Sequence, residues 1–388
     1  MKAVVLAAGK GQRLWPLTEN RPKPMLPVAN RPILEHIVDA LTRTAVTEVL
    51  IVVGSNRDRI QSHFEDSYGD LDISYVVQDP QLGTGHALLQ AESHLGESFV
   101  ALNGDRVIDA AVVDAVVDRQ RETNDPVMAI TRIEQPSRYG VVELDGRTVV
   151  GLEEQPHPDR AKSDYINAGV YAFGPEIFAA IRRIESHGER ALTEALATFI
   201  DEQRLEAVRY QGTWLDVSAP WDLLAGNDAL LGTDRAPDAI PESAMIDASA
   251  VVAESTAIGE NAVVHPQAAV LSGVSLGDNV SIGAGAILKN TILLTDVTIK
   301  SGTVMTDCIV GANTTLGPNT TVEGGRTDVV LSESIHRDVT LGGLIGDNVA
   351  GGGNVTVTPG TIVGNTATLD SGTYVSGRVE DGSHVQRG

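Results

Sequence analysis

Hydrophobic positions in roughly the first third of the chain form short apolar runs that alternate with helix-like periods. Short apolar runs predict buried strands, and apolar residues three to four positions apart predict helices. The expected strands are 4–6, 49–53, 73–77 and 99–102, and the expected helices are 33–44, 85–94 and 110–121. This alternation indicates an α/β domain with a mostly parallel sheet, helices on both faces, and ligands beyond the carboxyl ends of the strands.

The pattern changes after Ala225, where an apolar residue begins to recur at every sixth position. A period of six does not suit a helix of 3.6 residues per turn, but it suits a coil with three flat faces whose stacked turns bury the apolar column. The column is interrupted near Leu294, and Gly351 takes one of its positions. Its apolar members are Ile246, Val252, Ile258, Val264, Val270, Leu276, Ile282, Leu288, Leu316, Val322, Ile345, Val357, Val363, Leu369 and Val375.

The length and the turn-forming residues predict two domains. A chain of 388 residues can form two cores without disulfides. Residues 233–241, rich in Asp and Pro, are the expected linker between a first domain of residues 1–232 and a repeat domain of residues 242–388. The lone Cys308 cannot pair within the chain and is interpreted as a small buried hydrophobe.

The chain is strongly acidic, with a formal net charge of -23. Such a surface repels nucleic acid and anionic membranes, so a phosphate-bearing ligand would need a local cationic pocket. The spread of acids through both halves is typical of a protein adapted to strong salt, with an ordinary acidic mesophilic protein as the alternative. The absence of a membrane-length apolar run and of a signal-peptide pattern predicts a cytoplasmic protein.

Glycines and two cations follow the first predicted strand. The Gly9-Lys10-Gly11 loop lacks the third glycine of a dinucleotide fingerprint, and the sequence has no Walker A string. Arg13 follows at a short distance, and Lys23 lies between two prolines that stiffen the backbone around it. This arrangement predicts a backbone that approaches an anionic ligand closely.

The string LAAGKGQRLWPLTENRPKPMLPV resembles the characteristic motif of the sugar-1-phosphate nucleotidylyltransferases. Further blocks follow in that family's order: QDPQLGTGHA at 78–87, LNGD at 102–105, RYGVV at 138–142, INAGVY at 166–171 and WLDV at 214–217. The resemblance covers the first domain and implies a Rossmann-like nucleotidyltransferase fold. It also implies a reaction that joins a nucleoside triphosphate to a sugar-1-phosphate and releases pyrophosphate.

The resemblance assigns roles to individual residues. It implies catalytic cations at Arg13 and Lys23 and Mg²⁺ ligands at Asp105 and Asp216. The implied nucleotide-binding residues are Leu6, Ala8, Gly9, Gly11, Gln78, Gly83 and Thr84, with Thr84 also a candidate for the sugar. The implied sugar-phosphate-binding residues are Gly140, Glu154 and Asn167. Gln78 and the Gly83 amide would pair with a pyrimidine, which favours UTP or dTTP, and the expected acceptors are glucose-1-phosphate and N-acetylglucosamine-1-phosphate.

Two positions depart from the family pattern. Gln155 stands where the family usually has a lysine that holds the sugar phosphate, which leaves Lys162 or Arg160 as candidate substitutes. Arg106 follows the metal-binding aspartate, where a smaller or neutral residue is common. These departures leave the metal assignment intact and put the placement of the sugar phosphate in question.

The six-residue column resembles the left-handed β-helix of hexapeptide-repeat proteins, which is expected to assemble subunits, with a trimer favoured. In bifunctional relatives this domain acetylates glucosamine-1-phosphate with acetyl-CoA, and His336 is the candidate base for that alternative; a solvated loop histidine is the default interpretation. A further alternative is a non-catalytic subunit that senses nucleotide sugars. The retained cations Arg13 and Lys23 and the retained acids Asp105 and Asp216 favour catalysis.

Overall fold

The computed structural model describes residues 1–54, 56–184, 188, 190–233, 235, 239–332 and 334–387. The chain divides into two compact units. The first comprises Met1–Lys10, Pro22–Met25 and Ile33–Asp216, and the second comprises Gly11–Arg21, Leu26–Pro32 and Val217–Gly388. Gly11–Arg21 and Leu26–Pro32, which lie in or next to the N-terminal motif, therefore belong to the same unit as the C-terminal part of the chain. Part of the predicted linker, residues 234 and 236–238, lies outside the described residues.

A ten-stranded sheet forms the centre of the first unit, in the order β10-β11-β13-β9-β12-β7-β1-β4-β6-β5. Strands β7, β1, β4 and β6 are parallel neighbours, which confirms the parallel arrangement predicted from the alternating pattern. The strands are β1 (Lys2–Ala7), β4 (Glu48–Val53), β5 (Ser67–Tyr68), β6 (Leu71–Val77), β7 (Phe99–Asn103), β9 (Val127–Arg132), β10 (Gly140–Asp145), β11 (Thr148–Glu154), β12 (Tyr165–Phe173) and β13 (Glu206–Arg209).

The other half of the sheet is mixed, which differs from the mostly parallel sheet that the pattern predicts. β12 runs antiparallel to both β7 and β9, and β10 is antiparallel to β11. The cause of the last pairing is local: only Gly146 and Arg147 separate β10 from β11, and Gly146 has a φ of 63°. A two-residue connection can join only antiparallel strands.

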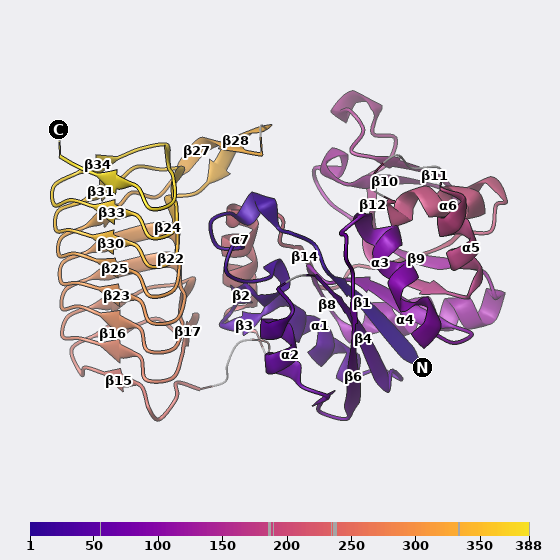
Figure 1. Cartoon of the computed structure of the whole chain (residues 1–388), viewed down its shortest axis with the longest axis horizontal. Coiled ribbons are helices and arrows are strands. Elements are labelled where there is room, and N and C mark those ends of the chain that lie inside the picture. The colour runs from indigo at the N-terminus through magenta and orange to yellow at the C-terminus, as the bar shows by residue number, and fades with distance from the viewer. Residues whose placement is uncertain are drawn as a thin grey trace. The chain divides into compact units, whose positions relative to one another are not determined.

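Helices cover both faces of this sheet (Figure 1). Helices α3, α5 and α6 contact one another on one face, and α4 packs on the other face with α1 beside it. The bounds in the first unit are α1 (Ile33–Thr42), α2 (Asp58–Phe64), α3 (Gly83–Ala91), α4 (Ala110–Thr123), α5 (Glu176–Arg183) and α6 (Leu192–Asp201), with short helices η2 (Lys23–Met25), η3 (Glu92–His94), η4 (Pro136–Arg138) and η5 (Pro158–Arg160). None of the helices in the described ranges is long and apolar enough to cross a membrane.

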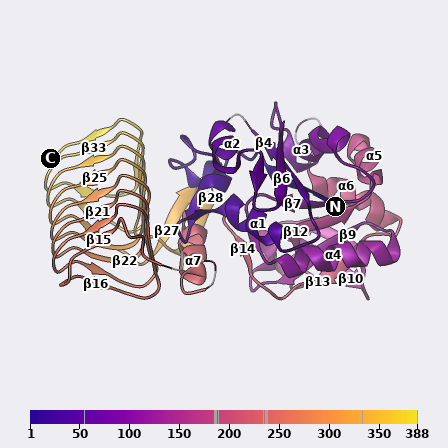
Figure 2. The ribbon, with the colours of Figure 1, turned by 90° about the horizontal axis from the view of Figure 1, so that it is seen from below.

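The second unit is built around a parallel β-helix, in which short strands stack in three columns (Figures 1 and 2). Ile246 pairs with Val264, Val252 with Val270, and Ile258 with Leu276, so one turn of the coil advances each face by 18 residues. The predicted apolar column fills the interior. The coil strands are β15 (Met245–Ile246), β16 (Val251–Val252), β17 (Thr256–Ile258), β18 (Val263–Val264), β19 (Ala269–Val270), β20 (Val274–Leu276), β21 (Ser281–Ile282), β22 (Ile287–Leu293), β23 (Thr298–Ile299), β24 (Val304–Val310), β25 (Thr315–Leu316), β26 (Thr321–Val322), β29 (Gly343–Ile345), β30 (Ala350–Gly351), β31 (Thr356–Val357), β32 (Thr361–Val363), β33 (Thr368–Leu369), β34 (Tyr374–Val375), β35 (Arg378–Val379) and β36 (His384–Val385).

The interruption near Leu294 is a shortened corner rather than a break in the coil. Leu293 pairs with Leu276 and takes the interior position one residue earlier than a step of six predicts. The next turn is shortened in the same way, because Val310 pairs with Leu293, again one residue earlier than a turn of 18 residues predicts. The larger gap after Val322 is filled by an antiparallel hairpin, β27 (Arg326–Leu331) and β28 (Ser334–Thr340), which projects from the coil (Figure 2).

One corner of the coil is made by residues with left-handed backbone, which explains the recurring strings such as IGEN and LGDN. Asn261, Asn279 and Asp296 have φ values of 56°, 59° and 60°. Asn and Asp tolerate this conformation better than other side chains. Asn261 Nδ2 donates to Asn279 Oδ1 at 3.1 Å, and Asn279 Nδ2 donates to Asp296 Oδ1 at 2.9 Å. The corner residues therefore link successive turns.

The second unit also contains segments outside the coil. They are η1 (Gln12–Leu14), the small strands β2 (Pro27–Val28) and β3 (Arg31–Pro32), and α7 (Pro220–Leu230). Buried Asn227 of α7 accepts from the Ala29 amide at 2.9 Å and donates to the Gly273 carbonyl of the coil at 3.0 Å. This one side chain joins three segments that are distant in sequence.

Candidate functional site

The two predicted acids meet on a small ribbon of the first unit. Strand β8 (Arg106–Ile108) pairs antiparallel with β14 (Trp214–Asp216), and the register sets Asp216 opposite Arg106. Asp105 directly precedes β8. The ribbon therefore brings two carboxylates from distant parts of the sequence to one place, with Arg106 between them.

Lys23 completes a compact group of charges, which we call the acid–cation cluster: Lys23, Asp105, Arg106 and Asp216. Lys23 Nζ lies 2.6 Å from Asp105 Oδ2, and the Arg106 guanidinium donates to Asp105 Oδ1 at 3.0 Å. The same guanidinium nitrogen also donates to the Asp216 carboxylate. The Asp216 side chain is 4% exposed and that of Asp105 is 29% exposed, so solvent reaches the cluster from the Asp105 side.

The electrostatics keep these groups charged. Burial alone would raise the pKa of the Asp105 carboxyl, but Arg106 and Lys23 outweigh it and hold that pKa well below its usual range. Burial would likewise lower the pKa of Arg106, and Asp105 and Asp216 raise it instead. Both shifts favour the charged forms of Asp105 and Arg106.

Arg106 is supported by aromatic neighbours as well as by the acids. Its guanidinium lies 5.4 Å from the centre of the Trp214 ring, a distance suited to a cation–π contact. Trp214 donates from Nε1 to the Ala168 carbonyl at 2.9 Å and packs edge-on against Tyr139 at 5.4 Å. The buried Nε of Arg106 has no hydrogen-bond partner among the described residues.

The predicted base-reading residues lie where β6 ends and α3 begins. Gln78 is 4% exposed, and its Nε2 donates to the Gly83 carbonyl at 2.9 Å and lies 3.1 Å from His86 Nδ1. Burial, and then Arg190, lower the pKa of His86, which favours a neutral ring beside the amide. Gln78 and Gly83 are therefore held together by a direct hydrogen bond.

Gly83 and Thr84 also have structural tasks. Gly83 has a φ of 85°, and a Cβ there would lie 2.6 Å from the Arg190 carbonyl oxygen. The Thr84 hydroxyl accepts from the Leu192 amide at 2.9 Å. These contacts fix the start of α3 against the segment before α6, so both residue types are explained without a ligand.

The predicted sugar-phosphate residues gather on β10, β11 and β12. Gly140 pairs with Glu154, and a Cβ at Gly140 would lie 3.0 Å from Glu154 Oε1. Asn167 Nδ2 donates to the Tyr171 hydroxyl at 2.7 Å, and its Oδ1 accepts from the Gly169 amide. Burial of the Glu154 carboxyl raises its pKa, against the opposing effects of Thr193 and Arg106. Glu154 is thus within the electrostatic reach of the acid–cation cluster.

The remaining predicted nucleotide-binding residues and the predicted catalytic Arg13 fall in different units. In the first, Leu6 and Ala8 are buried at the end of β1, whereas Gly9 is exposed and a Cβ there would meet no atom within 4 Å. In the second, Gly11 has a φ of 63°, and Arg13 is exposed on η1. The positive φ therefore explains glycine at position 11, whereas the packing gives no reason for glycine at position 9.

The segment that carries Arg13 is fastened to the coil within the second unit, which the sequence did not predict. The Arg21 guanidinium lies 2.9 Å from both carboxylate oxygens of Asp347, and these side chains are only 6% and 3% exposed. Asn365 Nδ2 donates to Glu19 Oε2 at 2.6 Å. Arg378 lies 3.9 Å from the centre of the Trp15 ring.

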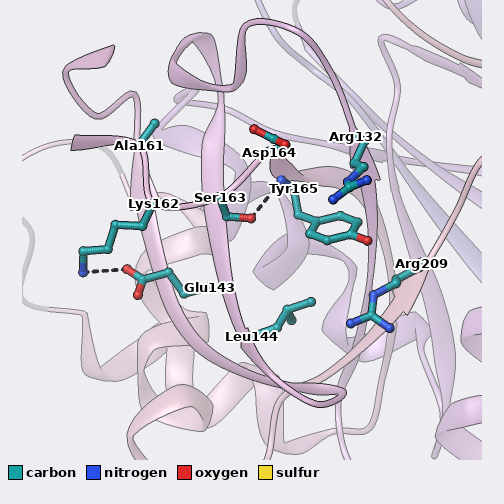
Figure 3. A pocket seen from close by; sticks show the side chains of 9 residues that line it. All are labelled: Arg132, Glu143, Leu144, Ala161, Lys162, Ser163, Asp164, Tyr165 and Arg209. Carbon is teal, nitrogen blue, oxygen red and sulfur yellow. Dashed lines mark hydrogen bonds and ion pairs between the residues drawn. The ribbon is translucent and has the colours of Figure 1, made fainter. Parts of the chain in front are cut away.

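A separate open pocket of about 590 Å³ lies beside Tyr165 (Figure 3). Arg132 and Arg209 both approach the Tyr165 ring, at 4.9 and 5.5 Å from its centre. Lys162 Nζ lies 2.8 Å from Glu143 Oε1. Lys162, a candidate substitute for the family lysine, is thus paired with Glu143 here, and Arg160 is exposed on η5. The pocket is lined by Arg132, Glu143, Leu144, Ala161, Lys162, Ser163, Asp164, Tyr165 and Arg209.

His336 lies on β28, in the hairpin that projects from the coil. Its ring centre is 5.0 Å from that of Trp221 on α7, with the planes tilted by 50°. The histidine therefore packs against an aromatic side chain of the same unit.

The donor set available for a metal is small. No group of three or more His, Cys, Asp or Glu side chains in the described part of the chain is arranged to hold a metal ion. Asp105 and Asp216 nevertheless direct carboxylate oxygens at one shared cation, Arg106. Mg²⁺ is commonly held by one or two carboxylates together with substrate phosphates and waters, so this pair fits such an ion.

Two family models match the chain. The nucleotidyl transferase model matches residues 2–232, and the GMPPB C-terminal domain model matches residues 252–379. The first match covers more than half of the chain, and the second falls on the coil.

Curated relatives match along most or all of the chain. It is 34% identical over 410 residues to the bifunctional protein GlmU of Methanococcus maripaludis, covering 100% of this chain and 97% of the relative. It is 33% identical to a glucose-1-phosphate thymidylyltransferase of Streptomyces antibioticus, covering 90% and 93%. It is 38% identical over 229 residues to the UTP–glucose-1-phosphate uridylyltransferase AglF of Haloferax volcanii, covering 57% and 93%.

Solved structures share the fold of the first part. A UDP-glucose pyrophosphorylase from Acinetobacter baumannii superposes with a TM-score of 0.56 at 23% identity, covering 61% of this chain and 95% of that one. A UDP-glucose pyrophosphorylase complexed with UDP-glucose gives a TM-score of 0.54 at 25% identity, covering 59% and 97%. These structures match a Rossmann-like nucleotidyltransferase fold.

Proposed function

Because the chain belongs to the nucleotidyl transferase family, we propose that it transfers a nucleotidyl group from UTP or dTTP to a sugar-1-phosphate and releases pyrophosphate. Relatives that span the chain place it in the class of sugar-1-phosphate nucleotidyltransferases. The proposed acceptors are glucose-1-phosphate and N-acetylglucosamine-1-phosphate. The observation that carries the proposal is the acid–cation cluster, which joins two carboxylates and two cations in one partly enclosed place.

We propose that Asp105 and Asp216 hold Mg²⁺ during the reaction. When bound there, Mg²⁺ would neutralise phosphate charge next to the reacting phosphorus. The convergence of both carboxylates on one cation supports this assignment.

The proposed chemistry needs positioning and charge stabilisation. An oxygen of the sugar phosphate attacks the α-phosphorus of the nucleotide, and the bond between this phosphorus and the oxygen of the departing pyrophosphate breaks. Lys23, whose side chain is 12% exposed and whose ammonium group lies beside Asp105, would stabilise negative charge on the phosphates. The attacking oxygen is already anionic at neutral pH, so no side chain has to remove a proton from it.

The substrates would be recognised by the neighbouring groups. Gln78, held against Gly83, would contact the pyrimidine base. Glu154 on β11 and Asn167 on β12, two strands that both pair with β10, would bind the sugar. Gly140 leaves space beside Glu154 because it has no side chain.

Pyrophosphate release tests this proposal. UTP and dTTP are each combined with Mg²⁺ and each acceptor, and at least one pair should give turnover; silence with every pair refutes the proposal. Asp105→Asn and Asp216→Asn should each lower kcat by about 100-fold or more. Asp72→Asn is a matched control because Asp72 is exposed on β6. Full turnover in either cluster variant would remove that carboxylate from the proposed site.

Acetyl transfer at the coil is a second candidate, favoured by the end-to-end match to relatives named bifunctional. Acetyl-CoA and glucosamine-1-phosphate would then release free coenzyme A thiol, and His336→Ala should abolish that release. Absence of thiol release from the unmodified protein rejects this candidate and leaves the nucleotidyl transfer untouched.

A further inference from the structure

Arg106 occupies the place on which both proposed metal ligands converge. One guanidinium nitrogen donates to Asp105 and to Asp216, so the two carboxylates share this cation, and Asp105 also contacts Lys23. A divalent ion and this guanidinium cannot both lie between the same two oxygens. Whatever cation binds there from solution must first displace Arg106.

The charges of the acid–cation cluster sum to zero without any ligand, since Lys23 and Arg106 balance Asp105 and Asp216. A divalent ion held by the two aspartates raises this sum to +2. An incoming phosphate dianion restores neutrality, and the displaced guanidinium is a planar fork of donors that suits phosphate oxygens. Charge balance thus couples the entry of the ion to the entry of a phosphate.

The surroundings of Arg106 permit such an exchange. Its Nε already lacks a hydrogen-bond partner among the described residues, and the Trp214 face supports the guanidinium without a directional bond. Trp214 also contacts Tyr139, whose carbonyl accepts from the Gln155 amide at 3.0 Å. The positive charge of Arg106 also acts on the Glu154 carboxyl, where it opposes the rise in pKa that burial causes. The guanidinium therefore lies on the side of the cluster where the proposed sugar-phosphate residues gather.

We propose that Arg106 is an exchangeable internal cation: it bridges Asp105 and Asp216 in the free protein, leaves them when a divalent ion binds, and then donates to the phosphate of the sugar-1-phosphate. This inference rests on the proposed function and deepens it, because it assigns a phosphate-binding group to this chain. It predicts that the divalent ion and the sugar phosphate bind cooperatively and that this cooperativity depends on Arg106.

The first test measures metal binding without substrates or turnover. Mn²⁺ binding to the full-length protein is followed by electron paramagnetic resonance of the free ion. Arg106→Ala should bind Mn²⁺ at least about tenfold more tightly than the unmodified protein, because the competing cation is gone. Arg106→Lys, which retains a charge, should show a smaller gain. Arg132→Ala is the matched control, since Arg132 stacks on Tyr165 in the separate pocket. Equal Mn²⁺ affinity in Arg106→Ala and the unmodified protein overturns the proposal.

The second test measures coupling to the phosphate. Glucose-1-phosphate is titrated calorimetrically with and without Mn²⁺. In the unmodified protein Mn²⁺ should tighten binding, and Arg106→Ala should lose most of that gain while Arg106→Lys keeps part of it. An unchanged gain in Arg106→Ala refutes the assignment to phosphate. Both measurements are independent of turnover, so failure of the proposed reaction and failure of this inference are separable. Circular dichroism confirms that each variant is folded, and Arg106→Gln replaces Arg106→Ala if the latter is not.

Discussion

The Arg21–Asp347 pair makes the most direct prediction about stability. The side chains are 6% and 3% exposed, and Asp347 also accepts from the Ala312 amide at 2.8 Å and from Asn20 at 3.0 Å. Asp347→Asn keeps the shape of the side chain but removes its charge, which leaves the Arg21 guanidinium buried without a counterion. Removal of one partner from a buried pair costs about 3–5 kcal/mol of unfolding free energy.

Urea unfolding followed by circular dichroism measures this loss. Asp338→Asn is a matched control because Asp338 pairs with Arg326 where both side chains are exposed, at 65% and 72%. An exposed pair contributes about 0–1 kcal/mol, so the control should change stability little. Adding Arg21→Met to Asp347→Asn should recover part of the loss, because the unpaired charge is then gone.

Hydrogen exchange locates the effect. If Asp347 anchors the segment, amides of residues 12–20 should exchange faster in Asp347→Asn than in the unmodified protein. Equal destabilisation by Asp347→Asn and Asp338→Asn, or strictly additive effects of Arg21→Met and Asp347→Asn, would refute the reasoning.

Three further predictions concern single side chains. Cys308 is fully buried, and burial raises its pKa to about 12, so a disulfide reagent at pH 8 should label it only after unfolding; rapid labelling of the native protein would contradict this burial. Gly169→Ala should lower the unfolding free energy by about 1–3 kcal/mol, because φ is 76° and the new Cβ would lie 2.6 Å from Asn103 Nδ2; an unchanged melting temperature would count against it. The raised pKa of Glu154 means that the folded state favours the protonated carboxyl. The stabilisation of the folded state by this group is therefore present below the ordinary glutamate pKa of 4.5 and is lost as pH rises through the raised pKa. Glu154→Gln should therefore gain stability relative to the unmodified protein as pH rises, and a pH-independent difference would exclude this effect.

The hydrophobic pattern predicted the elements that depend on local periodicity. The runs at 4–6 and 49–53 became the parallel pair β1 and β4, and the six-residue column became the interior of the coil. The pattern did not predict the antiparallel pair β10 and β11, which depends on a two-residue turn, the antiparallel strand β12, or the shortened corner at Leu293. When one residue is missing from a corner, the next interior position is still occupied by an apolar side chain. The register of the coil therefore shifts by one residue, although the sequence remains as apolar as before.

The candidate site was predictable in its residue types but not in its pairings. The motif resemblance named Lys23, Asp105 and Asp216, and the structure places them together. Arg106 was noticed only as a departure, since its position opposite Asp216 depends on the register of β8 and β14. Asp347 had no distinguishing signal either: it lies in a GDN string like that of Asp278, and only the three-dimensional structure brings Arg21 to it.

The contact of Arg21 with the coil limits how the chain can be divided or recombined. A fragment that stops at the end of the nucleotidyl transferase match retains Arg21 but loses its counterion Asp347. It also loses Asn365, which donates a hydrogen bond to Glu19. Chimaeras that exchange the C-terminal half with a relative would have to carry over an acidic residue at the position of Asp347. The repeat half therefore supplies side chains that hold the segment before Pro22, and an exchange of this half would have to preserve them.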